Sequence, residues 1–381
     1  MPIIKPGRLT IWSGILLFFN FVVLFLLVLG FLAAYIPPDT YWPFAFAGLV
    51  FPYAVIANLF FVVIWMFLWR KLFLVSLIAL LICWSRLTNY LQLSRNVDES
   101  KTEISGLKVI SYNVQIFDLY NWGKSHISEK GYNILNVLKD EKPDLVCLQE
   151  YHAGRKSVID ISDSIKQINN LKYNHISFVN KDDKVMPYGI ATYSRWPIIN
   201  REVIIFEDNS VNFCIYSDIV VDEDTIRVFN VHLESIRLSK EDYLYVEELP
   251  KKTDTQEIFS ENSKKILRKF KRAFITRAPQ ARKLNEVINE SPFPVIVCGD
   301  FNDTPSSYTY HQLSNNLVDA FKESGKGIGM TYAGSLPSFR IDYILHDQAF
   351  TSVNYKTIRK NFSDHFPIST RIILDTKIQP Q

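Results

Sequence analysis

The chain has 381 residues, of which 48% are hydrophobic, and 42 Lys and Arg stand against 39 Asp and Glu. This length suggests two or three structural units, and the composition excludes a disordered chain, a collagen-like fibre and a small disulfide scaffold. The formal net charge of +3 is too small for the global basic excess that is typical of a nucleic-acid-binding protein.

Charge is distributed unevenly along the chain. Residues 1–91 hold five of the 42 basic residues and one of the 39 acidic residues, a net charge of +4. The remaining residues have a net charge of −1, and five of the seven Trp lie in the apolar first quarter. The two parts are therefore adapted to different surroundings.

The first quarter contains two long runs without a charged residue, residues 11–36 and 44–69. As a helix, each run would extend about 39 Å, which is enough to cross a hydrocarbon core of about 30 Å. Residues 72–91 are apolar apart from Arg86 and predict either a third span or a helix at the membrane interface. We therefore expect an all-α transmembrane anchor of two or three helices over residues 1–94, in contact with a lipid bilayer.

Basic residues beside these runs predict how the anchor is oriented. Lys5 and Arg8 precede the first run, and Arg70 and Lys71 follow the second. This pattern places the N-terminus and the second connection on the cytoplasmic side of a membrane such as the bacterial inner membrane. Three spans would leave the rest of the chain outside the cytoplasm, and two would leave it inside. We expect an integral, multi-pass protein whose larger domain is extracytoplasmic.

After a polar linker, residues 95–105, short β-rich runs alternate with helical stretches over residues 106–376. This alternation indicates one α/β domain with a two-sheet core and helices outside. The predicted strands are LKVISYNV, DLVCLQE, GIATYS, REVIIF, NFCIYSDIVV, TIRVFNVHL, PVIVCGDFN, RIDYIL and STRIIL. Helices are predicted over residues 130–139 and 277–289.

Residues 262–285 contain nine Lys or Arg and no Asp or Glu. Ile266, Leu267, Phe270 and Phe274 fall on one helical face, which predicts a basic amphipathic helix. Three interpretations stay open for it: a solvated helix packed on the domain, a rim that attracts phosphate, and a helix that rests on anionic lipid.

Polar residues stand where several predicted strands end. The clearest case is PVIVCGDFNDTP, in which a buried strand leads into Asp300 and Asn302. These two side chains project to the same side of an extended segment, where a carboxylate and an amide can orient a water and hold an oxyanion. Glu150 offers an oxygen ligand for a hard cation. Comparable positions are Asn113, His232, Asp342, Asp364 and His365.

The ordered set SYNV, LQE, GIATYSRWPI, VHLES, GDFNDTP, RIDYIL and SDHFP resembles the exonuclease-endonuclease-phosphatase superfamily of metal-dependent phosphoesterases. The resemblance covers residues 107–374. It implies a four-layer αββα two-sheet sandwich and a hydrolase that acts on phosphoester bonds by direct attack of an activated water. It also implies Mg²⁺ as the cofactor, with Mn²⁺ as a substitute.

The resemblance further implies roles for individual residues. Glu150 would be the principal Mg²⁺ ligand, Asn113 would touch the metal or the phosphate, and Asp364 would lie near the metal. Asp300 would align and deprotonate the attacking water. Asn302 would donate to the phosphoryl oxygens.

Two histidines complete the implied site. His365 would contact the scissile phosphate while Asp342 holds and polarises its imidazole. His232 would be the second active-site histidine of the deoxyribonuclease, sphingomyelinase and phosphatase branches; abasic-site endonucleases have a Tyr there, which argues against their repair activity. Additional candidates for substrate contacts are Tyr188, Arg195 and Arg277, although a strand aromatic and a surface arginine are the plainer interpretation of the first two.

The sequence leaves the substrate open. A lipid headgroup or a small-molecule phosphoester suits a membrane anchor, because tethering raises the effective concentration of a membrane-bound substrate. A nuclease acting on DNA or RNA would need a basic groove, which only residues 262–285 could provide. A catalytically inactive binding module is a third alternative, although the residues of every motif are present. No obligate protein partner is inferred.

Overall fold

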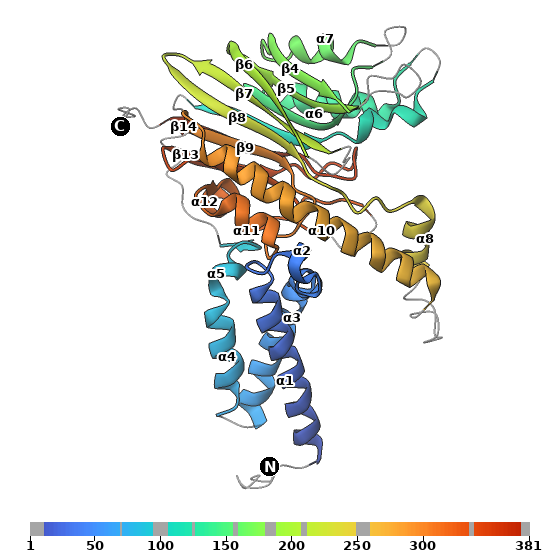
Figure 1. Cartoon of the computed structure of the whole chain (residues 1–381), viewed down its shortest axis with the longest axis vertical. Helices are drawn as coiled ribbons and strands as arrows, with labels where there is room; N and C mark the ends of the chain where they lie inside the picture. The colour runs from blue at the N-terminus through green and yellow to red at the C-terminus, as the bar shows by residue number, and fades with distance from the viewer. Residues whose placement is uncertain are drawn as a thin grey trace. The chain divides into compact units, whose positions relative to one another are not determined.

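The computed structural model of the chain (Figure 1) describes residues 11–68, 71–93, 106–123, 126–154, 159–179, 188–206, 212–248, 260–334 and 339–374. The chain divides into two compact units, Met1–Asn89 with Ser306–Tyr308, and Tyr90–Pro305 with Thr309–Gln381. The predicted linker and the basic residues Lys5, Arg8 and Arg70 lie outside the described residues.

The first unit is helical. Its helices are α1 (Ile11–Leu32), α2 (Pro38–Tyr41), α3 (Pro43–Leu68), α4 (Phe73–Ile82) and α5 (Trp84–Leu87). By length and composition, α1 and α3 are the two described helices that could cross a membrane.

The third apolar helix is shorter than the predicted span over residues 72–91. Helix α4 ends at Ile82, α5 ends at Leu87, and Leu91–Gln92 form a short strand, β1, that pairs with β11 (Gly327–Ile328). The ten residues of α4 extend only about 15 Å, half of a hydrocarbon core of about 30 Å. The predicted bounds of this span are therefore wrong at the carboxyl end, because the chain there is already extended and paired.

Buried polar side chains join the three main helices of this unit. Asn20 of α1 donates a hydrogen bond of 2.9 Å to Ser76 Oγ of α4, and Asn20 Oδ1 accepts one of 2.8 Å from Trp65 Nε1 of α3. All three side chains are buried. Hydrogen bonds of this kind join helices where no water is available as a partner, so they hold the short α4 against α1 and α3.

The second unit contains two six-stranded sheets. The strands of the first sheet, in spatial order, are β13 (Phe350–Thr357), β14 (Ile368–Leu374), β2 (Leu107–Asn113), β3 (Leu145–Tyr151), β5 (Gly189–Ser194) and β4 (Tyr173–Phe178). Those of the second sheet are β10 (Val318–Asp319), β12 (Asp342–His346), β9 (Val295–Asp300), β8 (Asp224–His232), β7 (Phe213–Val221) and β6 (Ile198–Ile205).

One central pair of strands in each sheet is parallel, β2 with β3 and β8 with β9. The other pairs are antiparallel. All nine predicted strands are present. Strands β4, β10 and β13 of these sheets are present as well, although the sequence did not predict them.

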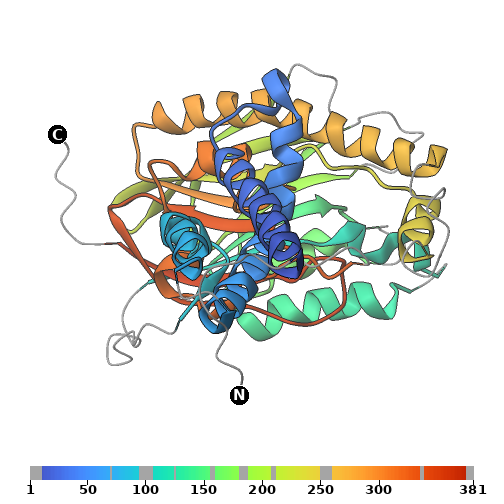
Figure 2. The same cartoon turned by 90° about the horizontal axis from the view of Figure 1, so that it is seen from below.

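Helices cover the outer faces of both sheets. Among the described residues of this unit, the helices besides the 3₁₀ helix η2 (Gln115–Asn121) are α6 (Glu129–Glu141), α7 (Ile161–Lys166), α8 (Lys240–Glu248), α10 (Glu261–Asn289), α11 (Tyr308–Ser314) and α12 (Ala320–Ser324). Ile134 and Leu138 of α6 pack on the first sheet, whereas Leu284 and Ile288 of α10 pack on the second. Figure 2 shows α10 and α6 on opposite sides of the sheets.

A third apolar layer lies between the two sheets. It contains Val109 and Cys147 of the first sheet and Val228, Ile296 and Ile344 of the second, each with no exposed surface. Alternate side chains of these strands therefore face each other across the sandwich, and the others face a helix. The predicted four-layer αββα sandwich is confirmed.

The predicted basic amphipathic helix and the predicted helix over residues 277–289 form one helix, α10. The side chain of Ser260 caps its first turn by accepting a hydrogen bond from the backbone N–H of Ser263. Ala273, Ala278, Ala281 and Leu284 lie on its buried face. Figure 1 shows the amino-terminal half of α10 next to α8, at one side of the sandwich.

Candidate active site

Four of the predicted site residues stand at the carboxyl ends of the two parallel strand pairs. Asn113 ends β2 and Glu150 is next to last in β3, while His232 ends β8 and Asp300 ends β9. Asp300 is in register with His232 on one side and with Asp342 of β12 on the other. Residues in register on neighbouring strands share a face of the sheet, so these three side chains form a row.

Gly299 permits this row to form. Its φ is +145°, and a Cβ atom there would lie 2.0 Å from the carbonyl oxygen of Val231 on the neighbouring strand. Any side chain at this position would push β9 away from β8. The glycine of the GDFN motif therefore places Asp300 directly beside His232.

One oxygen of Asp300 is the centre of the site. Asp300 Oδ2 accepts hydrogen bonds from Asn113 Nδ2 at 3.1 Å and Asn302 Nδ2 at 3.2 Å. His365 Nε2 lies 3.6 Å and His232 Nε2 3.8 Å from the same oxygen. The other oxygen, Oδ1, accepts the backbone N–H of Asn302 at 2.8 Å. Asp300 is 1% exposed, so its orientation is fixed from several sides.

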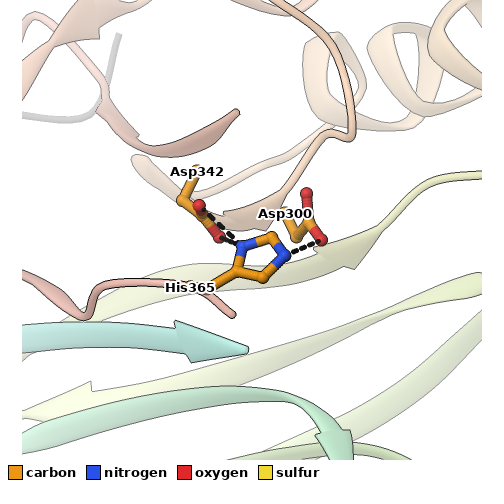
Figure 3. A group of neighbouring side chains, drawn as sticks. All are labelled: Asp300, Asp342 and His365. Carbon is orange, nitrogen blue, oxygen red and sulfur yellow. Dashed lines mark hydrogen bonds and ion pairs between the residues drawn. The ribbon is translucent and has the colours of Figure 1, made fainter. Parts of the chain in front are cut away.

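His365 connects two carboxylates, as Figure 3 shows. Its Nδ1–H donates to Asp342 at 2.9 Å, and its Nε2 lies 3.6 Å from Asp300. Asp342 is held in turn, because its backbone N–H donates to Thr331 Oγ1 at 3.1 Å. The predicted pairing of Asp342 with His365 is therefore present in the structure.

The two histidines differ in their electrostatic surroundings. Burial by itself lowers the pKa of His365, but Asp342 and Asp300 outweigh burial and raise this pKa well above its ordinary value. Burial also lowers the pKa of His232, and the attraction of Asp300 does not compensate. These surroundings favour a cationic imidazole at His365 and a neutral one at His232.

Glu150 and Asp364 form an acidic pair near this row. Burial and the negative charge of Asp364 raise the pKa of Glu150 to about 7. Glu150 has φ 49°, at an irregularity in the pairing of β3 with β5 that turns its side chain out of the strand's alternation. Asn113 Nδ2 lies 3.4 Å from Glu150 Oε1.

Comparison with known proteins identifies the larger unit. The sequence model described as the endonuclease/exonuclease/phosphatase family matches residues 110–365. The chain belongs to this family. A second sequence model, described as a domain of unknown function (DUF8431), matches residues 13–90. None of the curated proteins matches the chain.

Several solved structures are similar to the chain. A humanized D. rerio TDP2 with 14 mutations is 18% identical, with 71% of this chain and 100% of that chain covered and a TM-score of 0.48. SmcL is 16% identical, with coverages of 71% and 99% and a TM-score of 0.48. The mannosyl-6-phosphatase of Bacteroides thetaiotaomicron VPI-5482 is 15% identical, with coverages of 70% and 99% and a TM-score of 0.44.

As a member of the endonuclease/exonuclease/phosphatase family, the chain is a hydrolase that acts on phosphoester bonds. The family is generally dependent on a divalent metal, and the donor set of this chain fits one. Glu150 and Asp364 supply carboxylate oxygens, which are the ligands that Mg²⁺ prefers. Burial first and the negative charge of Asp364 second raise the pKa of Glu150, and a bound cation would offset both effects.

Asn113 fits a donor role better than a ligand role. Its Nδ2 faces Asp300 and Glu150, and its Oδ1 accepts the backbone N–H of Gln115 at 3.1 Å. Its amide would have to turn over to bind a metal. Asp300, Asp342 and His365 could also surround an ion by their spacing, but His365 already joins the two carboxylates.

Among the predicted substrate contacts, the structure places only Tyr188 near the family site. Burial and the negative charge of Glu150 raise the pKa of the Tyr188 hydroxyl, and Arg237 acts against them. Tyr188 therefore lies within electrostatic reach of the acidic pair. The preceding residues, 180–187, lie outside the described part of the chain.

Arg195 is not brought to the site. It follows Ser194, the partner of Leu145 at the start of β3, whereas Glu150 lies at the end of that strand. Its guanidinium pairs with Asp144 at 3.3 Å. This predicted contact is wrong, because Arg195 lies at the opposite end of the sheet.

Arg277 is not available to a substrate either. It is fully buried in α10, where its Nη1 lies 3.4 Å from Asp303 Oδ2. Asp303 follows Asn302 in the loop after β9, so Arg277 holds that loop from behind. The prediction of a substrate contact is wrong, and the physical reason is this burial beneath the loop.

Two residues beneath the site are not among those that the sequence predicts. Gln149 and Asn230 precede Glu150 and His232 in their strands and are fully buried. Their side chains form a hydrogen bond between the two sheets. The signal was present in the sequence, since an amide inside an otherwise apolar strand needs a partner in the core.

Proposed function

We propose that this chain is a membrane-anchored, Mg²⁺-dependent phosphoesterase that hydrolyses a phosphate ester by direct attack of water. The observation that carries the chemistry is the convergence of two amides and two imidazoles on Asp300 Oδ2. Such a carboxylate can orient a water and take its proton. Burial raises the pKa of Asp300, which makes it a better base than an exposed aspartate.

The remaining residues have complementary roles in this proposal. His365, kept cationic by Asp342, donates to an oxygen of the scissile phosphate. Asn302 would donate to the phosphoryl group in exchange for one of its hydrogen bonds to Leu233 and Asp300. Mg²⁺, held by Glu150 and Asp364, would neutralise negative charge that develops on the phosphate oxygens. No covalent intermediate with the protein is needed.

The apolar helices favour a substrate at the membrane. Helices α1 and α3 are long and apolar enough to cross a bilayer, and a tethered enzyme meets membrane-bound substrates at a high effective concentration. We therefore propose a lipid headgroup, or a small-molecule phosphoester met near the membrane, as the substrate. Near neutrality of residues 92–381, with a net charge of −1, argues against a nuclease.

A substrate panel tests this function. The full chain in detergent micelles is assayed with Mg²⁺ and with chelator on sphingomyelin, phosphatidylinositol phosphates, a chromogenic phosphodiester and plasmid DNA. We expect Mg²⁺-dependent hydrolysis of the chromogenic diester and of at least one lipid. Hydrolysis of DNA alone would overturn the lipid assignment, and activity that survives the chelator would overturn the metal dependence.

A further inference from the structure

A small hollow lies beyond the end of β8, between the loop that follows His232 and the middle of α10. Its walls include Glu234 and Arg237 of the loop and Lys269 and Arg272 of α10. It holds about 80 Å³, several times the ~10–15 Å³ that a water needs in the same measure. Three of these four polar residues are cations.

Arg237 is fixed in place on this wall. Its Nη2 lies 2.9 Å from Glu234, whose side chain is 3% exposed. The backbone N–H of Glu234 donates to Gln280 Oε1 of α10 at 2.9 Å, which anchors the loop. Arg237 has φ 53°, a conformation that residues other than glycine adopt only where the surroundings impose it. Its side chain is nevertheless 40% exposed, so one face of the guanidinium is available to a ligand.

Four cations in the amino-terminal half of α10 form ion pairs with acidic side chains. Lys264 and Arg268 pair with Glu261, and Lys265 and Lys269 pair with Asp242 of α8. Lys269 also donates to the carbonyl oxygen of Arg237 at 3.0 Å.

Arg272 differs from these cations. It is exposed, and the structure gives it no acidic partner among the described residues. The hollow therefore has an excess of positive charge that Glu234 and Asp242 do not balance.

The hollow is close to the reacting centre. The positive charge of Arg237 lowers the pKa of His232 and that of Tyr188, and the negative charge of Glu150 raises the pKa of Tyr188. Burial and the negative charges of Asp364 and Glu150 raise the pKa of Tyr243 of α8. The hydroxyl of Tyr243 accepts a hydrogen bond of 3.3 Å from Tyr332, and the ring of Tyr332 contacts the ring of His365 edge-on. The loop and α8 thus form one rim of the active site.

We propose that Arg237 and Arg272 form a subsite for a second anionic group of the substrate, next to the site of phosphoester hydrolysis. This inference rests on the proposed function and narrows its substrate class. The scissile phosphate occupies the centre between Asp300 and His365, and a phosphate or carboxylate elsewhere in the same small molecule or headgroup occupies the hollow. Guanidinium groups suit this task because they bind such oxygens with paired, charge-assisted hydrogen bonds.

Ligands with one or two anionic ends test the subsite without depending on turnover. The dissociation constants of alkane monophosphonates and of α,ω-alkane bisphosphonates of increasing length are measured by calorimetry, with the full chain in detergent and Mg²⁺ present. We expect one bisphosphonate length to bind about tenfold more tightly than the matching monophosphonate, as one additional charge-assisted contact provides.

Two α10 variants locate the effect. Arg272→Met should reduce the preference for the bisphosphonate to about onefold. Arg268→Met, one turn earlier on the same helix and paired with Glu261, should leave the preference as in the wild type. Arg237→Lys should reduce it partly and keeps a positive charge beside the buried Glu234, so a folding defect is not expected.

Any of three results with the phosphonates would overturn the subsite. These are equal affinity for mono- and bisphosphonates at every length, a preference that survives Arg272→Met, and a loss that Arg268→Met reproduces. Competition by a single-stranded oligonucleotide that depends on Arg272 would also overturn it, because the cations would then track a nucleic-acid backbone. Absence of phosphodiester hydrolysis by the wild-type chain would instead overturn the proposed function. The two failures are thus distinguishable.

Discussion

Gln149 Nε2 donates a hydrogen bond of 2.7 Å to Asn230 Oδ1, from one sheet of the sandwich to the other. Asn230 Nδ2 donates in turn to the carbonyl oxygen of Ala191 at 2.9 Å. Glu150 and His232 lie one and two residues beyond this bond. The two sheets each supply half of the active site, so the bond between them sets how the halves face each other.

Asn230→Ala should therefore weaken both the fold and the site. It removes the hydrogen bond from Gln149 and the bonds that Asn230 donates to the carbonyl oxygens of Leu148 and Ala191, all inside the core. This loss costs about 2–4 kcal/mol in free energy of unfolding. Thermal unfolding of the full chain in detergent measures this loss. Asn316→Ala, at an exposed asparagine pair, should change stability by less than about 0.5 kcal/mol. Equal stability of the two variants would show that the buried hydrogen bond does not hold the two sheets against each other.

Glu150→Gln should have opposite effects with and without metal. Without metal, the substitution removes a negative charge that Asp364 repels, so the melting temperature should rise. With metal, the loss of a carboxylate ligand should weaken Mg²⁺ binding at least about tenfold. The increase of melting temperature with Mg²⁺ concentration measures both effects. A variant that responds to Mg²⁺ like the wild type would remove Glu150 from the metal site.

His175 should make the fold sensitive to mild acid. Burial and the positive charge of Arg201 lower the pKa of His175 to about 4 from an ordinary value of 6.5, and its Nδ1 lies 3.0 Å from Ser217 Oγ. Between these pH values the unfolded chain binds a proton that the folded chain does not. Stability is therefore complete above about pH 6.5 and falls as the pH decreases toward 4.

The comparison of wild type with His175→Gln isolates this contribution. The wild type should lose about 1–3 kcal/mol more than the variant between pH 7.5 and 4.5. Thermal unfolding in detergent at the two pH values measures the difference. The same decrease in both proteins would mean that other groups cause the acid sensitivity.

The side of the membrane depends on the third apolar helix. If α4 and its flanking residues cross the bilayer, a reporter enzyme fused after Gln381 is extracytoplasmic, as the basic residues of the anchor predict. An alkaline-phosphatase fusion should then be active, and a fluorescent protein that folds only in the cytoplasm should be dark. The reverse pattern would place α4 on the cytoplasmic surface and the active site inside the cell.

Much of this architecture is readable from the sequence, because strands with apolar residues on both faces predict a sandwich covered by helices. Strand ends such as the GDFN segment also revealed Asp300 and Asn302. Strand β13, FTSVNYKT, was missed because polar residues interrupt its apolar pattern. Strand β4 is mostly half-buried, and such a strand carries a weak signal.

The positions of arginine side chains were the hardest to predict from the sequence. Arg195 and Arg277 belong to segments near the family motifs. Arg195 nevertheless lies at the end of β5 that is remote from Glu150, and Arg277 is buried beside the loop after β9. Arg237 has no motif of its own. A long cationic side chain can point in many directions, so only tertiary packing decides whether it reaches a substrate.

In the proposed metal-dependent site Asp300 activates the attacking water, and the variant Asp300→Asn removes this function. The substitution keeps the shape of a side chain that Asn113 and Asn302 hold, and it removes the base. We expect the full chain with Mg²⁺ to hydrolyse bis(p-nitrophenyl) phosphate, and the variant to lose about 10²–10⁴-fold in kcat while it unfolds cooperatively. Asp140→Asn, on the exposed face of α6, should retain wild-type kcat. A wild-type kcat in Asp300→Asn would show that Asp300 is not the base.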